Sequence, residues 1–285
     1  MVVKRRPAVA GAFYEDDGEL LRNRIEWSIN HELGPARNPR SIGDPVAVVV
    51  PHAGLIYSGP IAAHSYVAIK KRLSPSTFII MGPNHYGVGA PVAVMNEGVW
   101  ETPLGDIEID SSIANELMKS FEGLEVDSFA FEREHSVEVQ VPFIQHLFPG
   151  SKIVPIVVWE QTLDVARRMA QALVSVIGNR KDVVFVASSD LNHYEPHDVT
   201  SEKDMKAIER IIKLDSEGLM DIMDRLNISI CGFGAILTAM EYSKLRGIKH
   251  VDLLMHATSG DTGPNKMETV GYASIAFHVG DDYQH

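Results

Sequence analysis

The 285-residue sequence contains only one cysteine, Cys231. A single cysteine excludes an intrachain disulfide framework, and it excludes a metal site built from several cysteines of one chain. Any metal would therefore need nitrogen and oxygen donors, with one thiolate at most. Cys231 precedes an apolar helical pattern, a position typical of a buried structural thiol. Low cysteine use also fits the cytoplasm, where disulfides are rare.

Long apolar runs and concentrated positive charge are also missing. No run approaches the roughly 18–20 apolar residues of a membrane helix, and residues 1–16 lack the continuous apolar stretch of a secretory signal. We therefore expect a cytoplasmic protein without a membrane segment. The net charge is −12, and the basic clusters extend no further than residues 4–6 and 70–72. Because phosphate contacts need a concentrated positive face, this pattern disfavours nucleic-acid binding.

Common catalytic signatures are absent as well. The sequence has no G-x-x-x-x-G-K-[ST] phosphate loop and no G-x-G-x-x-G motif after its first expected strand, so common nucleotide chemistry is not indicated. The residue types of a serine triad occur within residues 188–193, but no G-x-S-x-G elbow surrounds them. Because the members of a triad converge from separate elements, a serine hydrolase is disfavoured.

What the sequence contains is the composition of an ordinary globular protein, with 45% apolar and 22% charged residues. Apolar runs alternate with helical patterns, which predicts an α/β fold with a mostly parallel central sheet flanked by helices. No linker divides the sequence, so we expect a single domain over residues 1–285. The expected strands are 46–50, 78–81, 92–95, 153–158, 183–187, 251–255 and 269–278. The expected helices are 15–30, 58–73, 111–121, 134–148, 162–177, 201–213, 216–225 and 234–245.

Four of the expected strands are followed by breaks rich in His, Asp, Ser, Gly and Asn. The breaks are residues 51–54, 82–85, 188–193 and 256–261. If these strands run parallel as neighbours, all four breaks emerge at one edge, where open α/β sheets bind ligands. Any one break alone would be an ordinary loop. Because each contains a histidine, the set predicts a metal site or an acid–base site.

His52 and His85 are the leading candidates for metal ligands. Each follows a buried strand by a few residues, and neutral imidazole is the commonest side-chain ligand of transition metals. Two histidines and one carboxylate form the usual open Fe(II) site. The sequence pattern does not decide the third ligand, and the alternative for each histidine is a hydrogen-bonded loop residue. The candidate carboxylates are Glu134, Glu138, Asp190 and Asp261.

His193, Asp190 and His135 are the candidate catalytic residues. His193 has the side chain of a general base near neutral pH, and Asp190 would either orient it or ligate the metal. The alternative is a local turn stabilised by the Asp190 side chain. Glu134 and His135 would supply another acid–base pair, or they would simply begin a helix. His256 is expected to contact the metal ligands and not the metal itself.

A series of short motifs occurs in order over nearly the whole chain, from about Pro7 to His278. The motifs are residues 10–14, 51–59, 82–85, 132–138, 188–194 and 229–232. Together they resemble the Memo family (mediator of cell motility). Because several ordered motifs match, the resemblance is specific.

This resemblance implies a fold similar to that of class III extradiol dioxygenases, non-haem iron enzymes that open catechol rings. It implies that His52 and His85 are the metal-binding pair and that His193 is the acid–base histidine. In animal Memo proteins a cysteine near the last strand joins the metal site, but the corresponding stretch 259–263 has none. On charge and hardness we expect Asp261 as the third ligand. Fe(II) is the expected metal, with Cu and Zn as alternatives.

Two main functional hypotheses follow. The first is a metal-dependent, dioxygenase-like oxidoreductase of unknown substrate, in which His193 moves a proton. The second is a non-catalytic binding or scaffold protein that keeps the pocket and binds a small molecule or a peptide, as animal members are described to bind phosphotyrosine motifs. Metal-assisted hydrolysis is a third. Association of microbial relatives with a radical-SAM protein, in the AmmeMemoRadiSam system, also implies a pathway partner.

Overall fold

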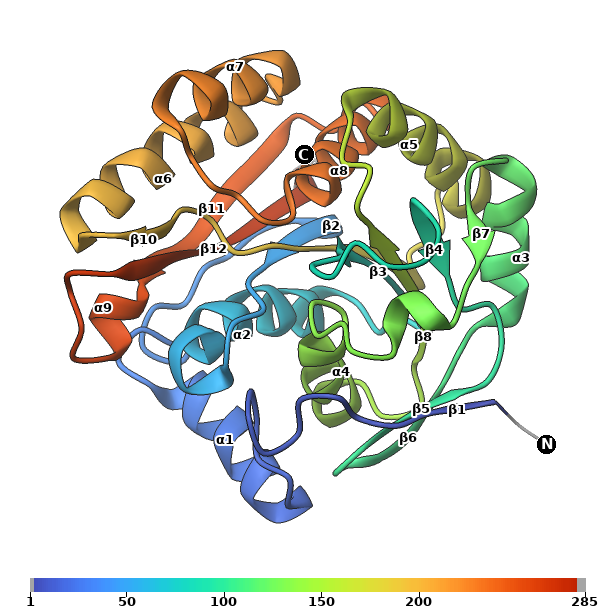
Figure 1. Cartoon of the computed structure of the whole chain (residues 1–285), viewed down its shortest axis with the longest axis horizontal. Helices are drawn as coiled ribbons and strands as arrows, with labels where there is room; N and C mark the ends of the chain where they lie inside the picture. Colours follow the sequence, from blue (N-terminus) through green and yellow to red (C-terminus); the bar gives the residue numbers. More distant parts are fainter. Residues whose placement is uncertain (1–2, 281–285) are drawn as a thin grey trace, which may run out of the picture.

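The computed structural model describes residues 3–280, in which nine strands form one large sheet (Figure 1). These strands are β2 (Asp44–Val50), β3 (Thr77–Pro83), β4 (Val92–Val94), β7 (Glu125–Val126), β8 (Lys152–Val158), β9 (Val183–Ser188), β10 (His193–Glu195), β11 (His250–Thr258) and β12 (Thr269–Val279). Their order is β10-β12-β2-β9-β3-β8-β4-β7, and β11 also pairs with β12. All seven strands expected from the sequence are therefore present.

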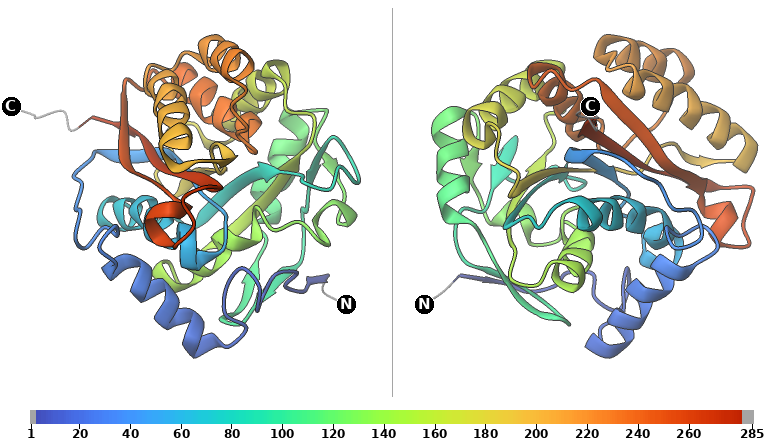
Figure 2. Two further views of the ribbon diagram at one scale, coloured as in Figure 1. Left: turned by 60° about the vertical axis from the view of Figure 1, so that its left-hand side comes forward. Right: turned by 180° about the vertical axis from the view of Figure 1, so that it is seen from behind.

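Helices cover both faces of this sheet (Figure 2). One face packs against α1 (Gly18–Asn30), α2 (Leu55–Arg72) and α4 (Val141–Leu147). The other packs against α3 (Ser111–Ser120), α5 (Leu163–Ile177), α6 (His197–Ile212), α7 (Ser216–Leu226) and α8 (Phe233–Leu245). Along β2, Val48 and Val50 face the first layer and Ala47 and Val49 the second, as the two-residue period of a strand requires. Across residues 3–280, no helix combines the length and apolar character needed to cross a membrane.

The expected α/β architecture with a central sheet between helices is confirmed, but the expectation of a mostly parallel sheet is wrong. β2, β9, β3 and β8 pair in parallel. However, β12 is antiparallel to both β2 and β11, and β4 is antiparallel to β8. The reason is the connection before β12. It is the short α9 (Ser259–Thr262) and a loop, which reverse the chain, whereas a parallel crossover needs a dozen or more residues.

The four polar breaks nevertheless reach one edge of the sheet. β2, β9 and β3 are parallel. β11 is separated from β2 by β12, and two antiparallel pairings restore its direction to that of β2. The carboxyl ends of all four strands therefore point the same way, as the sequence pattern predicted.

A second, small sheet lies beside the first helical layer. It contains β1 (Lys4–Arg5), β5 (Val99–Thr102) and β6 (Gly105–Glu108), in the order β1-β5-β6. None of the strands expected from the sequence falls at 101–110, a stretch that contains Pro103 and Gly105. In the structure both lie at the tight turn of a β5–β6 hairpin, which their backbone preferences favour.

The expected helix over 134–148 is also shorter than predicted. Only α4 is α-helical there, preceded by the short 3₁₀ helix η2 (Glu138–Gln140). Residues 134–135 have no regular structure and residues 136–137 form a turn, because the buried Glu134 carboxylate accepts hydrogen bonds from the backbone N–H groups of His135 and Ser136. Pro142 lies in the first turn of α4, where its missing N–H costs little.

Candidate functional site

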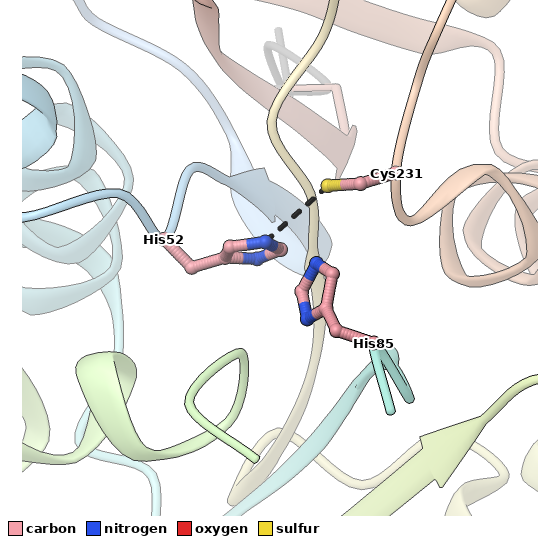
Figure 3. A group of neighbouring side chains, drawn as sticks. All are labelled: His52, His85 and Cys231. Carbon is pink, nitrogen blue, oxygen red and sulfur yellow. Dashed lines mark hydrogen bonds between the residues drawn. The ribbon is translucent and has the colours of Figure 1, made fainter. Parts of the chain in front are cut away.

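Three side chains from separate segments converge beyond the carboxyl ends of the central strands (Figure 3). His52 follows β2, His85 follows β3, and Cys231 lies just before α8. Nitrogen and sulfur atoms of these three residues lie within 4.8 Å of one another. His52 Nε2 is 3.3 Å from Cys231 Sγ, and the two imidazole rings meet edge to face with centroids 5.3 Å apart. The two predicted histidines are thus brought together.

The hydrogen bonds of Ser188 fix which nitrogen of His52 is protonated. Ser188 Oγ donates its only proton to the carbonyl oxygen of Ser136, at 2.6 Å, because a carbonyl can only accept. Oγ must therefore accept from His52 Nδ1 at 2.9 Å and from Gln140 Nε2 at 2.8 Å. Burial lowers the pKa of His52 well below its ordinary value. His52 is consequently a neutral imidazole that presents the lone pair of Nε2 to the cluster.

His85 is oriented in the same way by a carboxylate. Its Nδ1 lies 2.8 Å from Glu134 Oε1, and its backbone N–H donates to Oε2 at 2.6 Å. Burial opposes ionisation of Glu134, but the hydrogen bond from His85 and the Ser136 N–H outweigh it and lower the pKa of Glu134 to about 2. An ionised carboxylate can only accept, so Nδ1 carries the proton and Nε2 remains free. A carboxylate behind an imidazole is the usual support of a metal-binding histidine.

The loop that carries Cys231 lies close to the backbone at the end of β9, and this contact holds the thiol in place. Its Sγ accepts the N–H of Asp190 at 3.3 Å, and Ser189 Oγ accepts the N–H of Gly232 at 2.9 Å. A side chain at Gly232 would place its Cβ 2.4 Å from the carbonyl oxygen of Ser188, so only glycine allows the loop to come this close. Burial raises the pKa of the Cys231 thiol. The thiol is therefore protonated in the chain as described.

The donor set fits a transition-metal ion. Bonds of about 2.0–2.3 Å in a tetrahedral site place donor atoms about 3.3–3.8 Å apart, and the spacing between His52 Nε2 and Cys231 Sγ already matches this range. Two imidazoles and one thiol suit copper, zinc or iron, and they are too soft for magnesium or calcium. Three protein donors leave further positions for a substrate.

These residues form the inner wall of a pocket of about 760 Å³, which is within the size range of small-molecule sites. Residues from all four polar breaks line it, together with aromatic residues and the loop before β12. The lining residues are Phe13, His52, Ala53, Gly54, Tyr57, His85, His135, Asp190, His193, Tyr194, Ser229, Cys231, Ser259, Gly263, Pro264, Asn265, Glu268, Val270 and Tyr272.

His193, predicted as the acid–base residue, lies on this pocket with a defined tautomer. Its Nδ1 is 2.8 Å from the carbonyl oxygen of Ser229, and its backbone N–H donates to Ser229 Oγ at 2.9 Å. Because the carbonyl accepts, Nδ1 carries the proton and Nε2 is the basic nitrogen. Ser229 is itself held by Asn192 Oδ1, which accepts the Ser229 N–H at 3.1 Å.

Asp190 and His135 also line the pocket. Asp190 Oδ1 accepts the backbone N–H of His52 at 2.8 Å, and burial raises the pKa of Asp190 to about 6. The ring of His135 stacks on that of His85 with centroids 4.5 Å apart. Burial lowers the pKa of His135 to about 4, so its ring is neutral at neutral pH. His135, His85 and Glu134 form a second group of ligand-type atoms within 4.8 Å of one another.

Asp261, expected as the third ligand, is not brought to His52 and His85. Its carboxylate accepts the backbone N–H of Thr258 at 2.8 Å and forms the capping box at the start of α9. A Thr-x-x-Asp pattern caps the start of a helix through local hydrogen bonds, so the position of the Asp261 side chain is explained without a metal. The third donor beside the two histidines is instead the Cys231 thiol, which we interpreted as structural from its place before a helix.

Two further candidates have structural partners elsewhere. Glu138 is buried against Arg5 and accepts the hydroxyl of Tyr14 at 2.6 Å. His256 lies within β11 and contacts the buried Asp204 carboxylate at 2.8 Å. Neither lines the pocket. The signal that would have indicated Cys231 was its place in the 229–232 motif, one of those that carry the family resemblance.

Comparison with known proteins agrees with these motifs. A family model described as "Memo-like protein" matches residues 5–276. A "MEMO1 family protein" of Caldivirga maquilingensis is 57% identical over 97% of this chain and 100% of its own length. Another, from Pyrobaculum arsenaticum, is 53% identical over 96% of this chain and 99% of its own.

A solved structure of the uncharacterized protein JW3007 from Escherichia coli K12 is more distant. It has a TM-score of 0.47 and 14% identity, covering 79% of this chain and 98% of that one, and it supports no argument about the site. The family model and the close relatives each span almost the full chain. The chain therefore belongs to the Memo family.

Proposed function

We propose that this chain binds one transition-metal ion through His52, His85 and Cys231 and uses it in oxidoreductase chemistry on a small molecule in the adjoining pocket. The observation that carries the proposal is the state of the two imidazoles. Each has its Nδ1–H bonded to the protein and its Nε2 directed to a common point beside a thiol. Imidazoles whose Nδ1–H groups are held by protein acceptors in this way are the usual form of metal-binding histidines.

The donor set supports iron or copper for redox chemistry, with zinc as the redox-inactive alternative. A bound iron or copper ion would supply an electron-accepting centre beside the substrate. Glu134 would keep His85 in its ligating tautomer, and Ser188 would do the same for His52. His193 Nε2 faces the pocket as the base that takes a proton from a substrate O–H or N–H group.

The test is anaerobic calorimetry with Fe(II), Cu(I) and Zn(II) on the wild type and on the variants His52→Ala, His85→Ala and Cys231→Ser. We expect one metal per chain and at least tenfold weaker binding in each variant. His250→Ala is the matched control, since His250 begins β11 at the opposite edge of the sheet. Equal affinity in the control and the Cys231→Ser variant would refute the assignment of the thiol. No binding of any metal by the wild type would leave a non-catalytic binding protein as the better hypothesis.

A further inference from the structure

The rim of the pocket includes exposed aromatic side chains. Tyr57 and Tyr194 line it although 42% and 76% of their surfaces are exposed. The Tyr194 backbone has a φ of 62°, a left-handed conformation that non-glycine residues rarely adopt and that costs free energy. Phe13 lies deeper, with its ring centroid 4.5 Å from that of His135. Exposed aromatic faces around an opening offer stacking surfaces to a planar ligand.

The charge of the rim has one sign. Among the described residues that line the pocket, none is lysine or arginine, and the carboxylates are Asp190 and Glu268. Asp190 is buried and bonded to the His52 backbone. Glu268 is exposed, and within residues 3–280 its carboxylate has no hydrogen-bond or ion-pair partner.

The loop that carries Glu268 is fixed against the aromatic rim. Asn265 Oδ1 accepts the backbone N–H groups of Met267 at 2.9 Å and Glu268 at 3.4 Å. Gly263 packs so closely on Tyr57 that an added Cβ would lie 3.0 Å from the ring. The loop that carries Glu268 thus packs on Tyr57 through Gly263, and both Glu268 and Tyr57 line the pocket.

From this arrangement we propose that the pocket selects an aromatic ligand that carries a positively charged amine, and that Glu268 binds the ammonium group at the rim. The inference rests on the proposed function, because it names the class of molecule that the pocket would hold beside His52, His85 and Cys231. An ammonium gains attraction from both the carboxylate and the aromatic faces. A carboxylate or phosphate would find no arginine or lysine to pair with among the described lining residues, although such anions usually need one.

The test uses three probes with the same ring and different charges: tyramine (cationic), tyrosol (neutral) and 4-hydroxyphenylacetate (anionic). Phenyl phosphate, an aromatic anion without an amine, is a fourth probe. Binding is measured by saturation-transfer NMR and calorimetry on the full chain after chelation, so the outcome does not depend on whether a metal binds. We expect tyramine to bind about three- to tenfold more tightly than tyrosol, as one rim charge allows. The two anions should bind most weakly.

Variants assign this preference to the rim carboxylate. Glu268→Gln should equalise tyramine and tyrosol without changing tyrosol affinity, and Glu268→Lys should favour 4-hydroxyphenylacetate. Glu122→Gln is the control, because Glu122 is exposed and does not line the pocket. The inference is overturned if the anions bind as tightly as tyramine, if no probe binds at millimolar concentration, or if tyramine selectivity survives in Glu268→Gln. If the wild type binds no metal in the calorimetric titration but still prefers tyramine, only the metal assignment is refuted.

Discussion

At the scale of single residues, the site depends on which nitrogen each histidine exposes. His52, His85 and His193 each donate the Nδ1 proton to a protein partner, so that Nε2 carries the lone pair. The sequence predicted all three histidines, because each follows a strand in a polar break. It could not predict their tautomers, since the partners Ser188 and Glu134 are set by contacts between distant segments.

Replacement of Glu134 tests this orientation. Glu134→Gln keeps the shape of the side chain but removes the charge that holds the His85 Nδ1 proton, so metal affinity should fall about tenfold, and Glu134→Ala should lower it further. Calorimetric titration measures both. Glu132→Gln is the matched control, because Glu132 is exposed two residues away. If Glu134→Ala binds metal like the wild type, the carboxylate does not support His85.

The same carboxylate should contribute to acid sensitivity. The pKa of Glu134 is lowered from 4.5 to about 2 in the folded chain. The ionised form therefore stabilises the fold above about pH 4.5, and this contribution disappears as the pH falls towards 2. The shift corresponds to about 3 kcal/mol. Urea unfolding from pH 7 to pH 3 should show a steeper loss of stability in the wild type than in Glu134→Gln, and parallel losses would contradict the assignment.

At the scale of elements, strands with a strong local apolar pattern could be predicted, whereas contacts between distant segments could not. The strands 78–81 and 183–187 appear within β3 and β9, because continuous apolar runs of this length have few alternatives to a buried strand. The loop of Cys231 has no such pattern. Its position depends on the contact of Gly232 with the end of β9, which no local rule indicates.

Gly232→Ala tests this contact. The added methyl would lie 2.4 Å from the Ser188 carbonyl oxygen, so the loop must move and take Cys231 Sγ away from His52. We expect weaker metal binding and a loss of about 1–3 kcal/mol in the free energy of unfolding. Gly150→Ala is the control: its φ of 89° makes an added side chain destabilising, but the methyl meets no atom within 4 Å and Gly150 does not line the pocket, so metal affinity should stay near wild type. Unchanged metal affinity in Gly232→Ala would show that the loop position is not needed.

A buried ion pair between Arg5 and Glu138 joins the short strand β1 to the segment 131–138. Arg5 bonds the Glu138 carboxylate and the carbonyl oxygens of Phe131 and Glu134, and only 6% and 1% of the Arg5 and Glu138 side chains are exposed. Arg5→Ala would leave a buried carboxylate without its cation, at a cost of about 3–5 kcal/mol. Lys4→Ala removes an exposed pair on the same strand and should change little. Equal denaturation midpoints for the two variants would refute this role of Arg5.

At the scale of the whole molecule, the sequence predicted the layers but not all strand directions. Alternating elements indicated a sheet between helices, and the common edge of the four polar breaks followed from it. The direction of β12 could not be predicted, because the expected strands 251–255 and 269–278 leave 13 residues between them, enough for a parallel crossover, whereas β11 extends to Thr258 and shortens the connection. Tertiary pairing of β12 with both β11 and β2 decides it.

Metal binding should stabilise the whole fold, since its donors come from three separate segments that meet only when the chain is folded. At a free metal concentration about 100 times the Kd, the gain is about 2.7 kcal/mol. The melting temperature should then rise by about 5 °C or more. Differential scanning calorimetry with and without metal measures the rise, and Cys231→Ser should abolish most of it. An identical rise in that variant would place the metal elsewhere.

The position of β12 also sets the order in which the site is assembled during synthesis. β12 is the last strand of the described chain, yet it lies between β11 and β2 in the sheet. While the ribosome is still making residues 269–279, the segment that ends in His52 and the segment that ends in Ser259 have no shared neighbour to align them. The proposed metal ligands His52 and His85 can meet earlier, on β2, β9 and β3, but the pocket around them closes only when the final strand is inserted.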